Sequence, residues 1–308
     1  MYGVIDIGSN TIRFMIYHLQ QGTLCPMLNQ KATAGLASYI EKKKIRPEGI
    51  QEAVRILREF KQAADMIHLE KLWAFGTAPF RSISNAQEVV QAIQDECGIQ
   101  VQILSGREEA LLDYYGALYT SAMKDGLLLD VGGGSSELVF CQNKKPVFAA
   151  SVPLGSLNSY TSHVKNIFPS PEELRAVKND FQKQLEALSF PSNLSQPPII
   201  CSIGGTARTI LKIYNAWHHG APLNLQYSCT FFDECFDMLQ NNPSHLKKSI
   251  LRMAPERIHT LLPGMAIFDT AARFFHCPAV TTSRCGVREG FLYYILNEKN
   301  SGAIDFSL

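Results

Sequence analysis

The sequence has no apolar run that approaches the length needed to cross a membrane. Its first apolar stretch contains Asp6, so it lacks the uninterrupted apolar core of a signal peptide. The eight cysteines form no Cys-x-x-Cys pair, and most of them lie in apolar runs, where cysteine acts as a small hydrophobic residue. We therefore expect a soluble, cytoplasmic protein with reduced thiols.

Several catalytic and binding signatures are missing as well. The eight histidines have no metal-ligand spacing, which argues against a zinc site. There is neither a Gly-x-Ser-x-Gly elbow nor a Walker-type phosphate loop. Lysine and arginine number 29 against 28 acidic residues, so the net charge of +1 gives no reason to expect a nucleic-acid binder. Short basic clusters such as Lys247-Lys248 are interpreted as solvated faces.

What is present fits an α/β protein with two domains. The chain has 308 residues, 46% of them hydrophobic and 19% charged, which is enough for two cores. Strand and helix patterns alternate in both halves, which predicts parallel strands with right-handed crossovers. We place the domains at residues 1–122 and 123–308, with an interdomain cleft as the ligand site. The helix expected over 287–298 could pack on either domain.

The same order of elements opens each half. Three strands are predicted near residues 3–7, 12–19 and 24–32, and three more near 127–131, 137–141 and 147–152. In the first half, Pro47 opens a helix, and Ser84 with Gln87 predicts a capping box for the next one. Residues 218–262 have little periodicity, and their structure and role are not predicted.

One pattern occurs twice. Asp6-Ile7-Gly8-Ser9-Asn10-Thr11 and Asp130-Val131-Gly132-Gly133-Gly134-Ser135-Ser136 each follow an apolar run and lead into another strand. A strand that ends in Asp and a small-residue turn points backbone N–H groups outward, and such a nest binds phosphate oxygens. The adjacent carboxylate can hold a divalent cation. Two such turns, with Ser9 to Thr11 in one and Gly132 to Ser135 in the other, predict that a phosphate chain is held from both sides.

The carboxylates of this pattern have other interpretations. Asp6 and Asp130 could cap the amides of their turns without binding a metal. Glu137 interrupts an apolar strand just after the second turn. It is interpreted either as a further ligand of the cation or as a solvent-facing residue at the edge of the strand.

Three further segments suggest phosphate chemistry. Glu108 and Glu109 open a helix, and one of them could orient or deprotonate an attacking water. Because adjacent helical residues point about 100° apart, only one of the two would face the cleft. Stabilisation by the helix dipole is the structural alternative. Arg81, on a loop after the strand at 72–75, could pair with phosphate oxygens. Gly204-Gly205-Thr206 begins a helix after a strand, which is an anion site in principle, although tight packing explains many such glycine pairs.

Six motifs together resemble the exopolyphosphatase/guanosine pentaphosphate phosphohydrolase (Ppx/GppA) phosphatases, and the resemblance covers nearly the whole chain. The motifs are Asp6 to Thr11, Gly76-Thr77-Ala78-Pro79-Phe80-Arg81, Ser105-Gly106-Arg107-Glu108-Glu109-Ala110, Asp130 to Glu137, Gly204-Gly205-Thr206 and Gly286-Val287-Arg288-Glu289-Gly290. The resemblance implies an α/β fold of two duplicated actin-like (ribonuclease H-like) domains, as in the superfamily of sugar kinases, heat-shock chaperones and actin.

The resemblance also implies roles for individual residues. Glu109 would be the catalytic carboxylate, and Mg²⁺ or another divalent cation would lie near Asp130 and Glu137, with Asp6 as a third candidate ligand from its own turn. Ser9, Asn10, Arg81 and Gly133 to Ser135 would bind phosphate. The chain looks like the short form of the family, without the C-terminal HD-like domain that contributes to long-polymer binding and dimer contacts in longer members.

The sequence thus predicts hydrolysis of a terminal phosphoanhydride in inorganic polyphosphate, in pppGpp, or in both. The expected partners are polyphosphate or a guanosine penta- or tetraphosphate, with no nucleic acid and no membrane, and a homodimer is left open. Two alternatives remain: a nucleotide-dependent kinase or ATPase of the same fold, since fold alone does not fix function, and a non-catalytic alarmone or polyphosphate sensor.

Overall fold

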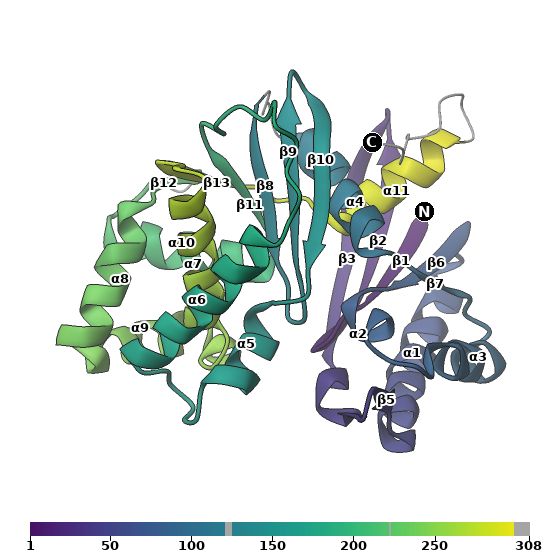
Figure 1. Cartoon of the computed structure of the whole chain (residues 1–308). Coiled ribbons are helices and arrows are strands. Elements are labelled where there is room, and N and C mark those ends of the chain that lie inside the picture. The colour runs from purple at the N-terminus through teal and green to yellow at the C-terminus, as the bar shows by residue number, and fades with distance from the viewer. Residues whose placement is uncertain (121–124, 222, 299–308) are drawn as a thin grey trace. The chain divides into compact units, whose positions relative to one another are not determined.

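The computed structural model describes residues 1–120, 125–221 and 223–298, and these form two compact units, Met1–Glu109 and Ala110–Leu308 (Figure 1). The domain boundary predicted between residues 122 and 123 falls outside the described residues. Each unit has its own sheet and its own hydrophobic core.

The first unit contains a five-stranded sheet in the order β3-β2-β1-β6-β7. Its first three strands form an antiparallel meander, and the last two run parallel to β1, as alternating strands and helices predict. The strands are β1 (Tyr2–Ile7), β2 (Thr11–Gln20), β3 (Thr23–Thr33), β6 (Lys71–Gly76) and β7 (Val101–Ile103), with β4 (Ile40–Glu41) and β5 (Lys44–Ile45) as a separate pair.

The helices of the first unit cover one face of this sheet. They are η1 (Leu36–Tyr39), α1 (Pro47–Ile67), α2 (Ala78–Arg81) and α3 (Ala86–Cys97). Pro47 lies in the first turn of α1, where its missing N–H costs no hydrogen bond. Leu57 and Phe60 of α1 are buried against Ile5 and Phe14 of the sheet. The predicted helix and strands are therefore confirmed in this unit.

Two local predictions for the first unit were wrong. Arg81 lies in the one-turn helix α2 rather than in a loop, because Pro79 in the first turn favours a helical start. The capping box of Ser84 does not form: α3 begins at Ala86 after Asn85, and the Ser84 hydroxyl donates to the carbonyl of Lys43 at 3.1 Å. A tertiary contact has replaced the local cap.

The second unit contains a six-stranded sheet in the order β10-β9-β8-β11-β13-β12. Its first three strands again form an antiparallel meander, and β11 and β13 continue the sheet in parallel. The strands are β8 (Gly126–Val131), β9 (Ser136–Gln142), β10 (Lys145–Val152), β11 (Ile200–Ile203), β12 (Gln226–Ser228) and β13 (Ala279–Thr282).

Both faces of this sheet are covered. On β8, Leu127 and Leu129 belong to the large core under the helices that follow the meander, whereas Leu128 points to the other face and packs with Tyr114 of α4. Helix α4 (Gly106–Thr120) begins in the last residues of the first unit and continues in the second. The other helices are α5 (Ser156–His163), α6 (Pro171–Glu186), α7 (Gly204–Trp217), α8 (Thr230–Asn241), α9 (Pro243–Met253), η2 (Pro255–Arg257), α10 (Leu261–Phe274) and α11 (Val287–Glu298).

The glycines at 116 and 290 let α4 and α11 approach closely. A Cβ at Gly290 would lie 1.8 Å from the carbonyl oxygen of Leu112, and one at Gly116 would lie 2.0 Å from that of Gly286. Only glycine fits at such a crossing. The second glycine of the Gly286 to Gly290 motif thus has a packing role.

All eight cysteines are free, as predicted. Burial raises the pKa of the Cys201 and Cys277 thiols to about 12, so both stay protonated at neutral pH. Cys25 and Cys285 are only half-buried. Among the described residues, the structure has no helix whose length and apolar character would let it span a membrane.

Candidate active site

The two Asp-containing turns have the same backbone geometry. The N–H of Gly8 donates to the carbonyl of Thr11, and the N–H of Gly132 donates to the carbonyl of Ser135, both at 3.0 Å. Gly132 and Ser135 of the second turn lie 124 positions after Gly8 and Thr11 of the first. The same offset relates Asp6 to Asp130. The repeat predicted from sequence is therefore a repeat of structure.

The first turn is held by the segment that follows β3. The carbonyl of Asn10 accepts from the N–H groups of Ala34 and Gly35 at 3.0 and 2.9 Å, and the carbonyl of Ser9 accepts from Ala37 at 2.9 Å. Gly35 has a φ of 58°, which favours glycine. With the carbonyls engaged, the N–H groups of Ser9 and Asn10 donate to no other described residue and suit an anion.

Helix α5 holds the second turn in the same way. The N–H of Leu157 donates to the carbonyl of Gly133 at 2.8 Å, and the side-chain amide of Asn158 donates to the carbonyl of Gly134 at 2.9 Å. A Cβ at Gly155 would lie 2.7 Å from three backbone atoms of the turn, so the approach needs glycine. Within the described chain, the N–H groups of Gly133 and Gly134 have no acceptor.

The two adjacent glutamates at the start of α4 have different surroundings. Glu108 accepts from the N–H of Ser105 at 2.7 Å, while the Ser105 hydroxyl accepts from the N–H of Glu108, so Glu108 closes a capping box. Glu109 instead forms a partly buried ion pair with Arg81, which also donates to the carbonyl of Leu104 at 3.2 Å. Of the two carboxylates, Glu109 is the one beside Arg81, the cation predicted to bind phosphate.

Asp130 and Glu137 form a pair of carboxylates across the second hairpin. They lie directly opposite each other on β8 and β9, so their side chains share one face of the sheet. Glu137 is 2% exposed, and its Oε1 accepts from the hydroxyls of Ser135 at 2.7 Å and Ser151 at 2.8 Å. Two carboxylates are what Mg²⁺ takes from a protein when waters and substrate phosphates supply the other ligands.

This donor set fits a magnesium ion that the substrate helps to hold. No group of three or more His, Cys, Asp or Glu side chains suited to a metal exists among the described residues. A site that depends on phosphate oxygens needs no such group. In the first hairpin, the residue opposite Asp6 is Arg13, not a carboxylate.

The glycine pair at the start of α7 lies against the same corner. Gly204 has a φ of +87°, and a Cβ there would lie 2.3 Å from Oδ1 of Asp130. The hydroxyl of Thr206 donates to the carbonyl of Val131 at 3.2 Å, so a phosphate at this position would use backbone N–H groups of the helix start.

The sequence did not point to two half-buried arginines near this corner. The Arg257 guanidinium lies against Gly205, where a Cβ would be 1.9 Å from Nη2. Burial lowers the pKa of both Arg257 and Arg208, and the charge of Asp130 opposes that shift in each. Arg208 also lines a pocket of about 370 Å³ with Thr282 and Ser283. Arg257 could have been found only by knowing that η2 folds back onto α7.

The structure thus brings the predicted residues together in two groups. One hairpin of the first unit carries Asp6, Ser9, Asn10 and Thr11. The ion pair of Arg81 with Glu109 lies in the same unit, outside that hairpin. Asp130, Glu137 and the turn from Gly132 to Ser135 share the hairpin of the second, against Gly204 and Gly205.

Comparison with solved structures confirms the predicted fold class. The chain is similar to the Ppx/GppA family member from Aquifex aeolicus, with a TM-score of 0.80 at 24% identity over 98% of this chain and 99% of that one. An exopolyphosphatase from Cytophaga hutchinsonii gives a TM-score of 0.85 at 24% identity, over 96% and 98% of the two chains.

Sequence comparison gives the same result. Exopolyphosphatase 1 of Mycobacterium tuberculosis is 32% identical over 307 residues, which cover 97% of this chain and 89% of that protein. The guanosine-5'-triphosphate,3'-diphosphate pyrophosphatase of Pseudoalteromonas atlantica is 23% identical over 96% of this chain and 58% of its own length. Residues 15–299 match the model of the Ppx/GppA phosphatase family, and the chain therefore belongs to that family.

Proposed function

We propose that this protein hydrolyses the terminal phosphoanhydride of inorganic polyphosphate, or the corresponding 5'-phosphate of pppGpp, and releases orthophosphate. Membership of the Ppx/GppA phosphatases and the names of two relatives support the reaction class. The single observation that carries the mechanism is the different engagement of Glu108 and Glu109.

In this mechanism Glu109 orients a water molecule and accepts its proton. The water oxygen forms a bond to the terminal phosphorus, the bond from phosphorus to the bridging oxygen breaks, and the shortened chain leaves as an oxyanion. Arg81 turns its N–H groups to the terminal phosphate, which frees the Glu109 carboxylate for the water. The turn N–H groups of Ser9, Asn10, Gly133 and Gly134 hold the phosphate oxygens.

Asp130 and Glu137 would hold the magnesium ion, which supplies charge neutralisation for the phosphoryl oxygens when bound. The serine hydroxyls at 135 and 151 fix the orientation of the Glu137 carboxylate. Gly204 leaves room for Asp130 beneath the start of α7. The half-buried guanidinium groups of Arg208 and Arg257 balance the negative charge of this corner.

The neighbouring glutamates offer a matched test. Orthophosphate release is measured with magnesium from polyphosphates of defined length and from pppGpp. Glu109→Gln should lower turnover by at least about 100-fold, the scale of a lost general base. Glu108→Gln should stay close to the parent protein, because glutamine also serves in a capping box.

Other outcomes would assign another function. Equal loss in both variants, or retained turnover in Glu109→Gln, would remove Glu109 from the role of general base. Transfer of phosphate to ADP in place of water would identify a kinase. Binding of polyphosphate or pppGpp without any turnover would identify a sensor.

A further inference from the structure

The packed helices α7 and α9 carry an unbalanced set of charges. They contact each other in the second unit, and neither contains an aspartate or a glutamate. The whole chain has 29 basic and 28 acidic residues, so this local excess stands out. The basic residues of the two helices are Arg208, Lys212, Lys247, Lys248 and Arg252.

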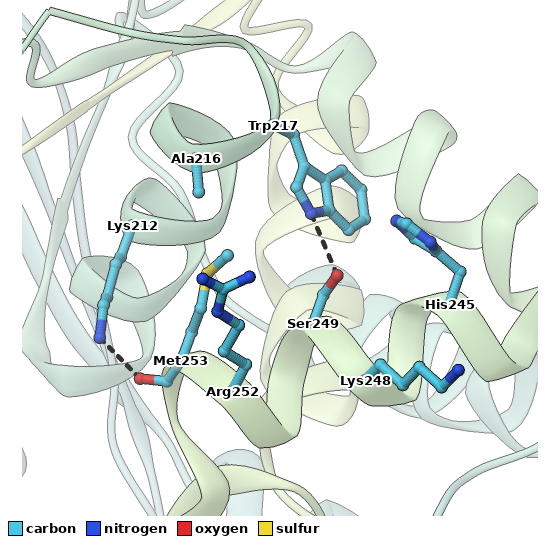
Figure 2. A pocket seen from close by; sticks show the side chains of 8 residues that line it. All are labelled: Lys212, Ala216, Trp217, His245, Lys248, Ser249, Arg252 and Met253. Atoms are coloured by element: carbon cyan, nitrogen blue, oxygen red, sulfur yellow. Dashed lines mark hydrogen bonds between the residues drawn. The ribbon is translucent and has the colours of Figure 1, made fainter.

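A pocket of about 650 Å³ lies between these helices (Figure 2). Its size is within the range of small-molecule sites. Its lining combines three cations with an indole, a thioether and an imidazole and includes no carboxylate. The lining residues are Lys212, Ala216, Trp217, His245, Lys248, Ser249, Arg252 and Met253.

Within the part of the chain that the structure describes, the cations of the pocket have no acidic partners. Lys248 and Arg252 are exposed and form no ion pair with any residue that the structure describes. Lys212 donates to the carbonyl of Met253 at 2.7 Å, which fixes its ammonium group at the pocket (Figure 2). Exposed arginines on other helices do pair with carboxylates, as Arg55 does with Glu52 and Arg175 with Glu172, both at 2.7 Å. Of the basic pair Lys247-Lys248, interpreted from sequence as a solvated face, Lys248 lines this pocket, whereas the Lys247 ammonium lies over the ring of Phe168.

Trp217 gives the pocket a fixed aromatic wall. Its Nε1–H donates to the hydroxyl of Ser249 at 3.3 Å, and its ring packs edge-on against Phe231 with centroids 5.7 Å apart. The His245 ring, also in the lining, lies beside the indole with the ring centroids 6.1 Å apart (Figure 2). A chain of phosphates alone would use only the cations. A wall of Trp217 and Met253 beside three cations suits a ligand with a flat aromatic part and a multiply charged anionic part.

We propose that this pocket binds a nucleoside di- or triphosphate, separately from the hydrolytic site. The base would stack on Trp217 and Met253, and the phosphates would contact Lys212, Lys248 and Arg252. At about 1.5 Å per residue along α7, Trp217 lies about 18 Å from Gly205, which packs at the Asp130 corner, and Lys212 lies about 10 Å from it. Binding here does not depend on whether Glu109 is a general base.

The two tryptophans of the chain allow a direct test. Replacing the other one, in Trp73→Phe, leaves Trp217 as the only indole. ADP, GDP and inorganic tripolyphosphate are titrated into this protein, and Trp217 fluorescence is followed. We expect saturable quenching by ADP or GDP. Lys248→Glu with Arg252→Glu should raise the Kd at least tenfold and leave orthophosphate release unchanged, whereas the control Lys144→Glu with Lys145→Glu should change neither.

A second pair of variants tests the aromatic contact. Trp217→Leu should raise the Kd for ADP or GDP about tenfold, measured by calorimetry, and Trp217→Phe should retain most of the affinity, since stacking on an aromatic ring contributes strongly to base binding. Absence of quenching, or quenching unaffected by the double charge reversal, would overturn the proposal. Tripolyphosphate binding that equals nucleotide binding and survives Trp217→Leu would also overturn it, in favour of a phosphate site.

Discussion

The β1–β2 hairpin and the β8–β9 hairpin have the same backbone but different chemistry. Both turns are closed by the same N–H to carbonyl bond, and both present an Asp near the end of the first strand. The residue opposite that Asp is Arg13 in one hairpin and Glu137 in the other. Arg13 places a positive charge opposite Asp6, whereas Glu137 places a second negative charge opposite Asp130 and creates a need for a cation there.

The two turns also differ in what anchors them. The first is held by backbone bonds from the short 3₁₀ segment around Ala37, and the second by the eight-residue helix α5 with Gly155 pressed against it. A duplicated fold can therefore keep the outward-facing turn amides in both copies and a pair of opposed carboxylates in only one. On this basis Asp130 and Glu137 are the stronger candidates for magnesium, and the role of Asp6 as a ligand stays a prediction.

The largest expected effect comes from removing the carboxylate that distinguishes the hairpins. Glu137→Gln should lower orthophosphate release by about 100-fold or more, because a metal contributes several kcal/mol of charge stabilisation. It should also raise the magnesium concentration needed for half-maximal rate, which a magnesium titration would measure. An unchanged magnesium requirement would contradict the assignment of Glu137.

A smaller effect is expected from adding a methyl group where a neighbouring segment packs against each turn. Gly155→Ala places a methyl group 2.7 Å from the turn backbone, whereas Gly8→Ala meets only the Thr11 carbonyl at 3.3 Å. We expect Gly155→Ala to cost about 1–3 kcal/mol of unfolding free energy, as overpacking does, and to reduce kcat/KM about tenfold. The control Gly8→Ala should change both less. Chemical denaturation and steady-state kinetics would measure these effects, and the opposite order would show that the first turn is the more constrained.

The smallest effect should come from making the hairpins alike. Arg13→Glu places two carboxylates opposite each other in the first hairpin, which should destabilise the magnesium-free protein by about 0.2–1 kcal/mol. Magnesium should then raise the Tm of this variant more than that of Arg13→Gln. Thermal unfolding with and without magnesium measures this change in Tm. An equal change in both variants would show that the first hairpin does not bind the ion even when it carries two opposed carboxylates.

The fold was predictable because its signals are local. Each Asp-containing turn follows a buried strand and precedes another, and Pro47 marks a helix start that the structure confirms. The family was predictable for the same reason, since its motifs lie in these turns and helix starts. The individual site roles remain predictions, although the capping bonds of Glu108 now distinguish it from Glu109.

What sequence could not supply were contacts between distant segments. The sequence predicts Ser84 as a helix cap, but its hydroxyl donates a hydrogen bond to the carbonyl of Lys43, in the turn between β4 and β5. Arg257 reaches Gly205 only because η2 returns to the start of α7. The same folding brings Lys248 and Arg252 to Trp217, and no local pattern in residues 218–262 showed that these side chains would line one pocket.

The thiols have a practical consequence for studying the motion of the protein. Cys25 lies on β3 in the first unit and Cys285 lies after β13 in the second, and both are half-buried, whereas Cys97, Cys141, Cys201, Cys235 and Cys277 are buried. The half-buried Cys229 thiol is held protonated by burial, which raises its pKa to about 12. The native chain therefore has a half-buried thiol in each unit, Cys25 and Cys285, to test as a position for a spin label or fluorophore. Interprobe distances could then follow the two units through turnover without any introduced cysteine.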